Sequence, residues 1–282
     1  MNQQRSILIT GCSSGIGHHC AHALAKRGWK VVASARQQAD VERLQAEGLL
    51  AVRLDLNDPE SIASGLEAAL ALTDRRLDAL FNNGAFGLPG AVEDLTRAAL
   101  RAQFETNLFG WHDLTRRVIP IMRAQGQGRI VHNSSVLGLV ALPFRGAYVA
   151  SKFALEGLTD CLRLELRGSG IEVSLIEPGP ILSRFRDNAF NAYQRHIDPH
   201  DSPYRATYRQ MEARLRKQGA AQPFTLTPEA VLRKLVHALE HPHPRARYAV
   251  TLPTHLLAVL RRLLPSRAMD WVLRRASRGG RG

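Results

Sequence analysis

The feature that most constrains the fold is a regular alternation of short apolar runs and longer amphipathic segments up to about residue 180. The apolar runs are rich in Ile, Val and Leu, which is typical of parallel strands buried on both faces. They span residues 6–10, 30–34, 51–55, 77–82, 128–134 and 171–177. The amphipathic segments span residues 17–27, 39–47, 59–73, 97–125 and 148–169. Strand, helix and strand in this order predict right-handed crossovers and a doubly wound α/β sheet.

The pattern changes between residues 184 and 227, where the chain is polar and only 204–218 has a helical pattern. An irregular insertion of this size is more typical of a functional lid than of a linker. A helix at 228–240, a short strand at 248–252 and a basic tail at 253–282 are expected to follow. Because 282 residues can bury one large core and no low-complexity linker interrupts them, we predict a single domain over 1–282.

The net charge of +13 comes from 38 basic and 25 acidic residues. Residues 253–282 contain seven Arg and one Asp, so nearly half of the excess lies in the tail. Thirty-three of the 38 basic residues are Arg, as expected from the codon usage of a GC-rich genome. No motif of a nucleic-acid-binding domain accompanies the charge, so we expect no nucleic-acid partner.

The composition argues against several other classes of protein. Hydrophobic residues make up 45% and charged residues 22%, as in ordinary globular domains. Cys12, Cys20 and Cys161 form no spaced pair, so neither a disulfide framework nor a metal site is expected. Neither a run of about 18 apolar residues nor a signal peptide is present. These features predict a cytoplasmic location.

A glycine-rich turn follows the first strand, with the sequence Thr10-Gly-Cys-Ser-Ser-Gly-Ile-Gly17. Such a turn brings backbone amides close to a phosphate, and the helix N-terminus behind it adds positive potential. The spacing is GxxxGxG, so a glycine turn without a ligand is the alternative interpretation. Its position in the first strand–helix unit favours a dinucleotide cofactor.

The residues after the second and third strands bear on the choice of cofactor. Ser34-Ala35-Arg36 stands where an acidic residue would bind the ribose 2′-hydroxyl of NAD. An Arg there suits the 2′-phosphate of NADP, so we predict a preference for NADP(H) over NAD(H), with one more surface Arg as the alternative interpretation. Asp55, followed by Leu56, is placed to accept from the adenine amino group. A helix cap or loop acid is an almost equally good interpretation of Asp55.

Tyr148 and Lys152 are four residues apart and are expected on one face of a helix. A phenol normally titrates near 10, and a neighbouring ammonium group lowers that pKa. Thirteen residues before Tyr148, Ser134-Ser135 ends a strand, where a hydroxyl could polarise a substrate carbonyl. Together these groups predict acid–base chemistry at a carbonyl.

These motifs resemble those of the short-chain dehydrogenase/reductase family, in its TGxxxGIG branch. They occur in order over about residues 5–185: TGCSSGIG (10–17), NNGA (82–85), Asn107 in ETNLFG, NSSVLG (133–138), YVASK (148–152) and EPGPI (177–181). The segments around LPF (142–144) and EPGPI are most similar to two subgroups: hydroxysteroid and retinol dehydrogenases, and bacterial NADP-dependent aldehyde reductases. The resemblance implies a Rossmann fold whose seven-stranded parallel sheet has the order 3-2-1-4-5-6-7.

The resemblance also implies a role for individual residues. Tyr148 would be the general acid in reduction, Lys152 would bind the nicotinamide ribose and Ser135 would be the catalytic serine. Asn107 would hold a water of a proton relay, with a packing amide as the alternative. The implied cofactor contacts are Gly11, Ser13, Ser14, Gly15, Ile16, Gly17, Asn83, Gly84, Pro178, Gly179, Ile181 and Ser183. The family usually has NNAG where this chain has Gly84-Ala85, which we expect the loop to tolerate.

The lid contains many aromatic residues, which predict an apolar pocket for a lipophilic aldehyde or ketone. The candidates are Phe144, Phe185, Phe190, Tyr193, Tyr204 and Tyr208, with Leu139 and Leu142 at the base. We see no cluster of charged residues that specifies a carboxylate. A catalytically silent, NADP-sensing regulator and a membrane-associated binding module are the alternatives to an enzyme.

The segment 256–282 is amphipathic and basic, and two interpretations of it remain open. It fits an interfacial helix in peripheral contact with an anionic membrane, and it fits a helix packed on the domain. The helices at 97–125 and 148–169 resemble the pair through which the family forms dimers. We therefore expect a homodimer or homotetramer.

Overall fold

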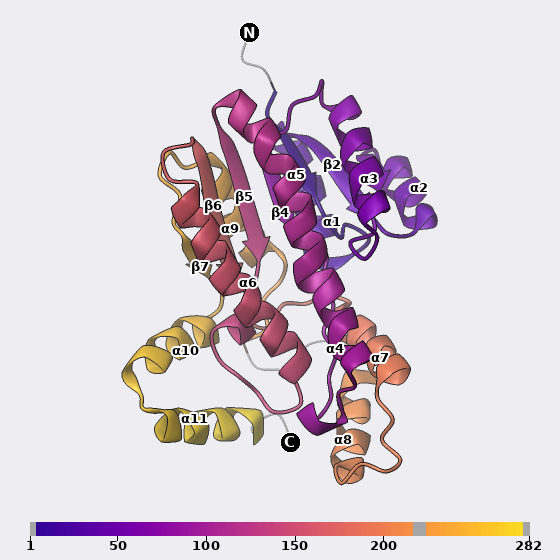
Figure 1. Ribbon diagram of the computed structural model, residues 1–282, viewed down its shortest axis with the longest axis vertical. Coiled ribbons are helices and arrows are strands. Elements are labelled where there is room, and N and C mark those ends of the chain that lie inside the picture. Colours follow the sequence, from indigo (N-terminus) through magenta and orange to yellow (C-terminus); the bar gives the residue numbers. More distant parts are fainter. Residues whose placement is uncertain (1–3, 217–223, 279–282) are drawn as a thin grey trace.

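The structure, a computed structural model, describes residues 4–216 and 224–278 (Figure 1). Its centre is a seven-stranded sheet in which every neighbouring pair is parallel. The strand order is β3-β2-β1-β4-β5-β6-β7, which confirms the doubly wound fold and the predicted order. The strands are β1 (Ser6–Ile9), β2 (Lys30–Ala35), β3 (Leu50–Arg53), β4 (Ala79–Asn82), β5 (Gly128–Asn133), β6 (Ile171–Glu177) and β7 (Arg247–Ala249).

Helices cover both faces of the sheet, and each face has its own core. On one face lie α1 (Gly15–Lys26), α2 (Gln38–Ala46) and α9 (Glu229–Glu240). On the other lie α3 (Pro59–Leu72), α5 (Gly110–Gln125) and α6 (Gly146–Glu165). In β1, Ile7 and Ile9 join the first core and Leu8 joins the second, since successive strand side chains point to opposite faces.

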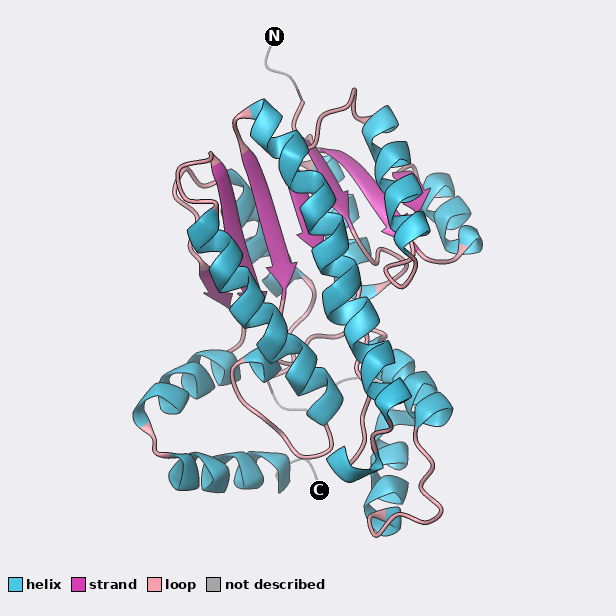
Figure 2. Ribbon diagram, in the orientation of Figure 1, coloured by secondary structure: helices cyan, strands magenta, loops and turns pink. Residues whose placement is uncertain are grey.

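All seven strands end at the same edge of the sheet. Figure 2 shows the arrowheads pointing toward the end of the molecule where α7 (Phe185–His196), α8 (Arg205–Arg216) and the C-terminal helices lie. The loops that follow β1, β4, β5 and β6 therefore meet at this edge. In open α/β sheets this is the edge at which ligands bind.

The segment predicted as one helix over 97–125 has three parts. α4 (Arg97–Phe104) leads into a π-helix (Glu105–Phe109), and α5 follows. Asn107 lies in the π-helix, a form that is rare and frequent at functional sites. The hydrophobic periodicity alone does not show this change of hydrogen bonding.

The predicted lid is more regular than its sequence indicated. α8 agrees with the expected helix as far as Arg216, and the end of that prediction lies outside the described residues. The sequence did not predict α7, because its buried stripe is narrow and consists of Ala189, Ala192 and Tyr193 amid polar residues. The strand predicted at 248–252 ends at Ala249, and Leu252 is already the first residue of the next helix, so the predicted end of the strand was wrong.

The basic tail forms two helices, α10 (Leu252–Leu263) and α11 (Ser266–Arg278), below the sheet in Figure 1. Met269 and Leu273 are buried with Val140, and Leu257 and Leu260 pack against them. The tail therefore packs on the domain next to the loop after β5. Among the helices of residues 4–216 and 224–278, none has the length and apolar character needed to cross a membrane.

Candidate active site

A cavity of about 400 Å³ opens at the carboxyl edge of the sheet, with the glycine turn at one part of its wall and Tyr148 at another. It is bounded by the loops after β1, β4, β5 and β6 and by α7 and α8. Most residues predicted from the sequence line it: Gly11, Ser13, Ser14, Gly15, Ile16, Asn83, Gly84, Ser135, Tyr148, Lys152, Pro178, Gly179, Ile181 and Ser183. Five others do not: Gly17, Arg36, Asp55, Leu56 and Asn107.

The glycine turn packs directly on the loop after β4. Gly11 has φ +70°, and a Cβ on it would lie 2.4 Å from Gly84 Cα. A Cβ on Gly17 would lie 2.4 Å from the carbonyl oxygen of Gly11. At Gly84 a Cβ would come within 3.1 Å of Leu56 Cδ1. The reversed pair Gly84-Ala85 therefore places the smaller residue against the turn, where space is tightest.

The Asn83 side chain holds this turn in place rather than extending freely along the cavity. Its Nδ2 donates to the carbonyl oxygens of Thr10 (3.0 Å) and Gly11 (3.2 Å), and its Oδ1 accepts from Asn133 Nδ2 at 2.9 Å. Asn133 Oδ1 is buried and has no hydrogen-bond partner within the described part of the chain. Since Asn133 lines the cavity, this oxygen is available to a bound donor.

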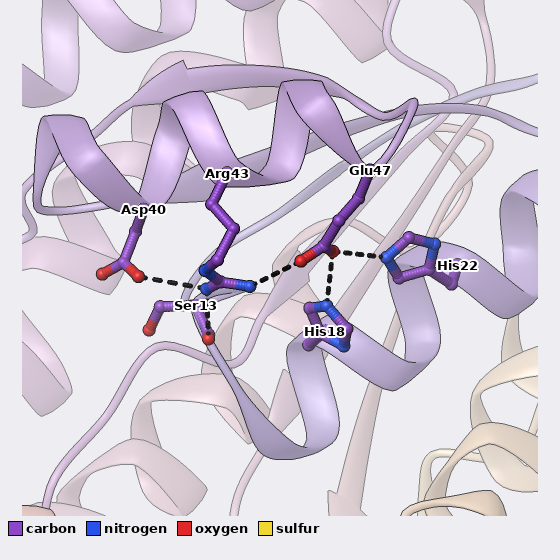
Figure 3. Close-up of polar contacts among 6 residues, drawn as sticks. All are labelled: Ser13, His18, His22, Asp40, Arg43 and Glu47. Atoms are coloured by element: carbon purple, nitrogen blue, oxygen red, sulfur yellow. Dashed lines mark hydrogen bonds and ion pairs between the residues drawn. The ribbon is translucent and has the colours of Figure 1, made fainter.

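On the other side of the turn, a charged cluster on α1 and α2 supports it (Figure 3). Arg43 Nη2 donates to the carbonyl oxygen of Ser13 at 2.7 Å, and Arg43 pairs with Asp40 and Glu47. Glu47 Oε2 lies 2.6 Å from His18 Nε2 and 2.8 Å from His22 Nε2. The hydrogen bonds from His22 and His18 hold the pKa of Glu47 low, at about 2.

Tyr148 lies in the first turn of α6 and lines the cavity together with Ser135. Burial raises the pKa of Tyr148 to about 12, and the nearby Ser135 hydroxyl opposes that shift. Burial therefore has a greater effect on this phenol than the predicted influence of Lys152. The Ser135 hydroxyl accepts from the Leu137 amide at 3.1 Å, which orients it. The phenol is protonated at neutral pH and can act as an acid.

Lys152 is almost completely buried and held in one position. Its Nζ donates to the carbonyl oxygen of Asn133 at 2.9 Å and lies 4.3 Å from the centre of the Trp111 ring. Nζ is 5.7 Å from the centre of the Tyr148 ring. Burial lowers the pKa of Lys152 to about 7, and the carboxylate of Glu156 opposes the shift.

The Asn107 side chain is fully buried and bonds to protein on both sides. Its Nδ2 donates to the Phe86 carbonyl (2.9 Å) and to Ser151 Oγ (3.3 Å), and its Oδ1 accepts from the Phe86 amide. Asn107 thereby connects the loop after β4 to α6. These contacts fit the packing-amide interpretation, and the proposed water relay stays a prediction.

The residues expected around the adenosine differ in their surroundings. Arg36 is exposed just after β2, and its guanidinium has no partner among the residues described. Asp55 Oδ1 accepts from the Asn57 amide at 3.0 Å, as the loop-acid interpretation predicted. Leu56 is buried beneath Gly84.

The predicted aromatic pocket is largely wrong, since only Phe185 and Leu142 of its residues line the cavity. Tyr193 and Tyr208 are buried in the core of α7 and α8, and Phe144 and Phe190 pack against that core. Tyr204 contacts Phe144 edge to face, and Leu139 packs toward the tail. The physical reason is that α7 packs on α8, so the rings of Phe190, Tyr193 and Tyr208 lie against one another, and Phe144 packs on Tyr208 from the loop before α6.

Sequence reasoning missed the charged part of the cavity. Four arginines line it: Arg145, Arg184, Arg186 and Arg214. Arg145 precedes Tyr148 by three residues, and this spacing was the only signal available in the sequence.

The wall of the cavity fits a dinucleotide. The amides at the N-terminus of α1 and the Ser14 side chain, which makes no capping hydrogen bond, suit a phosphate. Ser135, Tyr148 and Lys152 lie on the same wall, where a nicotinamide would meet a substrate. A redox cofactor and a carbonyl compound are therefore compatible with these residues.

Comparisons with known proteins agree with this geometry. The short chain dehydrogenase family matches residues 5–194. The chain is 48% identical over 270 residues to the uncharacterized oxidoreductase YbbO of Escherichia coli, covering 96% of this chain and 94% of YbbO. It is 35% identical over 259 residues to human 17-beta-hydroxysteroid dehydrogenase type 1, covering 87% and 77% of the two chains.

A solved structure agrees as well. The crystal structure of a short chain dehydrogenase/reductase from Burkholderia phymatum in complex with NAD has a TM-score of 0.78 and 26% identity to this chain, over 97% of each. The likeness to hydroxysteroid dehydrogenases expected from the sequence is confirmed. The chain is an oxidoreductase that belongs to the short-chain dehydrogenase/reductase family.

Proposed function

We propose that this protein is an NADP(H)-dependent oxidoreductase that interconverts a lipophilic aldehyde or ketone and its alcohol. The observation that carries the proposal is the buried Tyr148 phenol, which lines the same cavity as Ser135, Lys152 and the glycine turn. The part of the cavity wall that α7 and α8 form is called the substrate end. The apolar residues of the wall, including Leu142, Phe185 and Leu215, support a lipophilic substrate.

The chain's own groups suit the reduction of a carbonyl. The bound nicotinamide would supply the hydride. Tyr148 donates its proton to the carbonyl oxygen, and the Ser135 hydroxyl donates a hydrogen bond to the same oxygen. The raised pKa of Tyr148 keeps this proton in place at neutral pH. The ammonium of Lys152 stabilises the phenolate that remains.

The preference for NADP(H) is supported by Arg36. Its guanidinium follows β2 and is free of protein partners within the described ranges, so it is available to the 2′-phosphate. A guanidinium binds phosphate through two parallel charge-assisted hydrogen bonds. A 2′-hydroxyl gains much less from the same group.

The test is NADPH oxidation with unbranched aldehydes from butanal to decanal, in the wild type and in Tyr148→Phe. We expect kcat/KM to rise with chain length, and the variant to lose roughly 10²- to 10⁴-fold in kcat, with NADPH affinity preserved. A steep fall from butanal to decanal contradicts the apolar pocket. Unchanged turnover in Tyr148→Phe contradicts the mechanism, and NADPH binding without turnover of any carbonyl favours the NADP-sensing regulator.

We also propose peripheral contact with an anionic membrane through the tail. Leu256, Val259 and Leu263 are more than half exposed on α10, next to Arg261 and Arg262. Such a combination favours binding at a lipid interface. Wild type should float with vesicles that contain phosphatidylserine, and Val259→Ser/Leu263→Ser should not. Equal flotation of both proteins contradicts this contact.

We further propose that the protein forms a homodimer through α5 and α6. Leu158 and Leu164 are 41% and 65% exposed on α6, and Phe109, just before α5, is 49% exposed. A groove between the two helices continues this apolar surface. We expect light scattering to give the mass of a dimer or tetramer, and Leu158→Glu to give a monomer. A monomeric wild type contradicts the interface.

A further inference from the structure

The substrate end of the cavity has a strong excess of positive charge. Besides Lys152, its wall contains four arginines, and none of the described residues that line it is Asp or Glu. Arg184 pairs with Asp187, which is not part of the wall, at 3.8 Å. Among the described residues that line the cavity, no carboxylate offsets the charge of Arg145 or Arg214.

Arg145 shows this most clearly, because it is partly buried and has no counter-ion among the described residues. Its Nη1 donates to the carbonyl oxygen of Phe144 at 3.0 Å and lies 3.6 Å from Met211 Sδ. No carboxylate among the residues described pairs with it. Burial lowers the pKa of Arg145 to about 10, and the charge of Arg214 adds to the shift. A buried cation without a partner is costly, and a second cation nearby adds to that cost.

Arg214, on α8, is a second cation of the cavity wall without a paired carboxylate among the residues described. It lines the cavity beside Leu215. Burial and the charge of Arg186 both lower the pKa of Arg214. No described carboxylate forms an ion pair with Arg214. Two guanidinium groups from different elements thus face the same cavity without a carboxylate between them.

We propose that Arg145 and Arg214 bind an anionic group of the substrate, so that the lipophilic carbonyl compound carries a carboxylate or a phosphate. Guanidinium groups bind both anions through paired, charge-assisted hydrogen bonds. Arg145 immediately precedes α6 and lies three residues before Tyr148, about 4.5 Å along the helix axis. The anion therefore binds on the N-terminal side of the phenol, within the same cavity.

This inference rests on the proposed function and narrows its substrate class. Leu142, Phe185 and Leu215 line the cavity along with the two arginines, so the substrate has an apolar body and one anionic end. The anion would replace water around two cations that the protein itself leaves unpaired. Its binding energy would also fix the position of the carbonyl relative to Tyr148.

The experiment compares ω-oxo carboxylates, from the butanoate to the decanoate, with their methyl esters as substrates for NADPH oxidation. We expect at least one acid to exceed its ester by roughly tenfold or more in kcat/KM, the effect of one charge-assisted hydrogen bond. Arg145→Met and Arg214→Met should remove that preference by raising KM for the acid and should change kcat/KM for the ester by no more than about threefold. Arg145→Lys should retain part of it.

Arg209→Met is the matched control, since Arg209 is an exposed residue of α8 that does not line the cavity. It should keep the wild-type preference. ω-Phosphorylated aldehydes, tested in the same way, distinguish phosphate from carboxylate. If esters react and no acid or phosphate is preferred, or if Arg145→Met/Arg214→Met keeps the preference, this inference is wrong and the proposed function stands. If no carbonyl compound oxidises NADPH, the proposed function itself is wrong.

A second inference concerns His18, His22 and Glu47 of Figure 3, none of which lines the cavity. His18 and His22 are one turn apart on α1, and both Nε2 atoms approach the same oxygen of Glu47. The three groups can place their ligand atoms within 4.8 Å of one another. All three side chains are partly exposed, so an ion can reach them.

We infer that His18, His22 and Glu47 form a site for a divalent transition metal such as Zn²⁺. Two imidazoles and one carboxylate are a common zinc ligand set, with a fourth position left for water. Arg43 holds the other oxygen of Glu47 at 2.8 Å and also bonds to Ser13 in the glycine turn. Such outer contacts orient a ligand and would connect the metal site to the turn.

The experiment is a titration of tag-free protein with Zn²⁺ by calorimetry. We expect one site per chain, and His22→Gln should weaken it by at least about tenfold. His19→Gln is the matched control, because His19 lies on the same helix and pairs with Glu229 instead. The inference is wrong if His22→Gln binds as the wild type does, or if His19→Gln loses the same affinity.

Discussion

The two ends of the cavity are built in different ways. At the glycine turn, backbone packs against backbone, with Gly11 on Gly84 and the Asn83 amide bonded to two carbonyl groups. At the substrate end, side chains of α7 and α8 form the wall, among them Phe185 and Arg214. The first end cannot accept added atoms, whereas the second can change its residues while the sheet stays the same.

This difference predicts where substitutions act. A change at the backbone-built end should alter cofactor affinity, and a change at the side-chain-built end should alter the choice of substrate. Lys152 and Tyr148 lie between the two ends and should influence both. The following variants test this division, from the largest expected effect to the smallest.

Gly17→Ala should have the largest effect. Its Cβ would lie 2.4 Å from the Gly11 oxygen and 2.6 Å from Asn83 Nδ2, so the turn must move. We expect the Kd for NADPH to rise by roughly 100-fold or more, measured by nucleotide fluorescence. Gly157→Ala is the control, because nothing lies within 4 Å of its Cβ and alanine favours the helix. If Gly17→Ala binds NADPH with wild-type affinity, close backbone packing does not determine cofactor binding at the glycine turn.

Lys152→Met should change how stability depends on pH. The folded-state pKa of Lys152 is about 7, below its value of 10.5 in an unfolded chain. Between these values the unfolded chain binds more protons, so the wild type gains stability as pH rises, by up to about 1.4 kcal/mol per pH unit. Denaturant unfolding without nucleotide should show this slope between pH 7.5 and 9.5 in the wild type and its loss in Lys152→Met. Parallel curves for the two proteins contradict a Lys152 pKa that burial has lowered.

Arg36→Ala should separate the two cofactors. We expect kcat/KM for NADPH to fall roughly 10- to 100-fold and that for NADH to change by less than about threefold, because only NADP carries the phosphate. Arg75→Ala is the control, since Arg75 pairs with Glu67 and does not line the cavity. An equal fall with both cofactors shows that Arg36 has a general role instead.

The backbone-built end could be predicted from the sequence because its requirements leave few choices of residue. Only glycine fits the space at Gly11 and Gly17, and Tyr148 and Lys152 must lie on one helix face. The site can therefore be recognised from these residue types and their spacing in the sequence. The order of the strands came from the family resemblance to these motifs. The structure bears out that order and the parallel sheet.

The substrate end could not be predicted in the same way. Phe185 lines the cavity and Tyr193, eight residues later on the same helix, is buried in the core. Both are aromatic residues in a polar segment, and only the packing of α7 on α8 distinguishes them. Arg145 could not be identified from the sequence either, because an arginine near the start of a helix is common on protein surfaces.

Tyr208→Phe should have the smallest effect, and it tests whether the substrate end is independent. Tyr208 is fully buried; its hydroxyl donates to Asp94 at 2.5 Å and accepts from the Ala91 amide at 2.9 Å. Without it the Ala91 amide loses its partner and Asp94 keeps only the hydrogen bond from Ser202, so we expect a loss of about 1–2 kcal/mol in the free energy of unfolding. Because α8 also carries Arg214, kcat/KM should fall severalfold while the Kd for NADPH is unchanged.

Tyr204→Phe, at an exposed position, is the control and should change the free energy of unfolding by less than about 0.5 kcal/mol. A weakened NADPH affinity in Tyr208→Phe would mean that the two ends are coupled, and that α8 supports the glycine turn as well as the substrate.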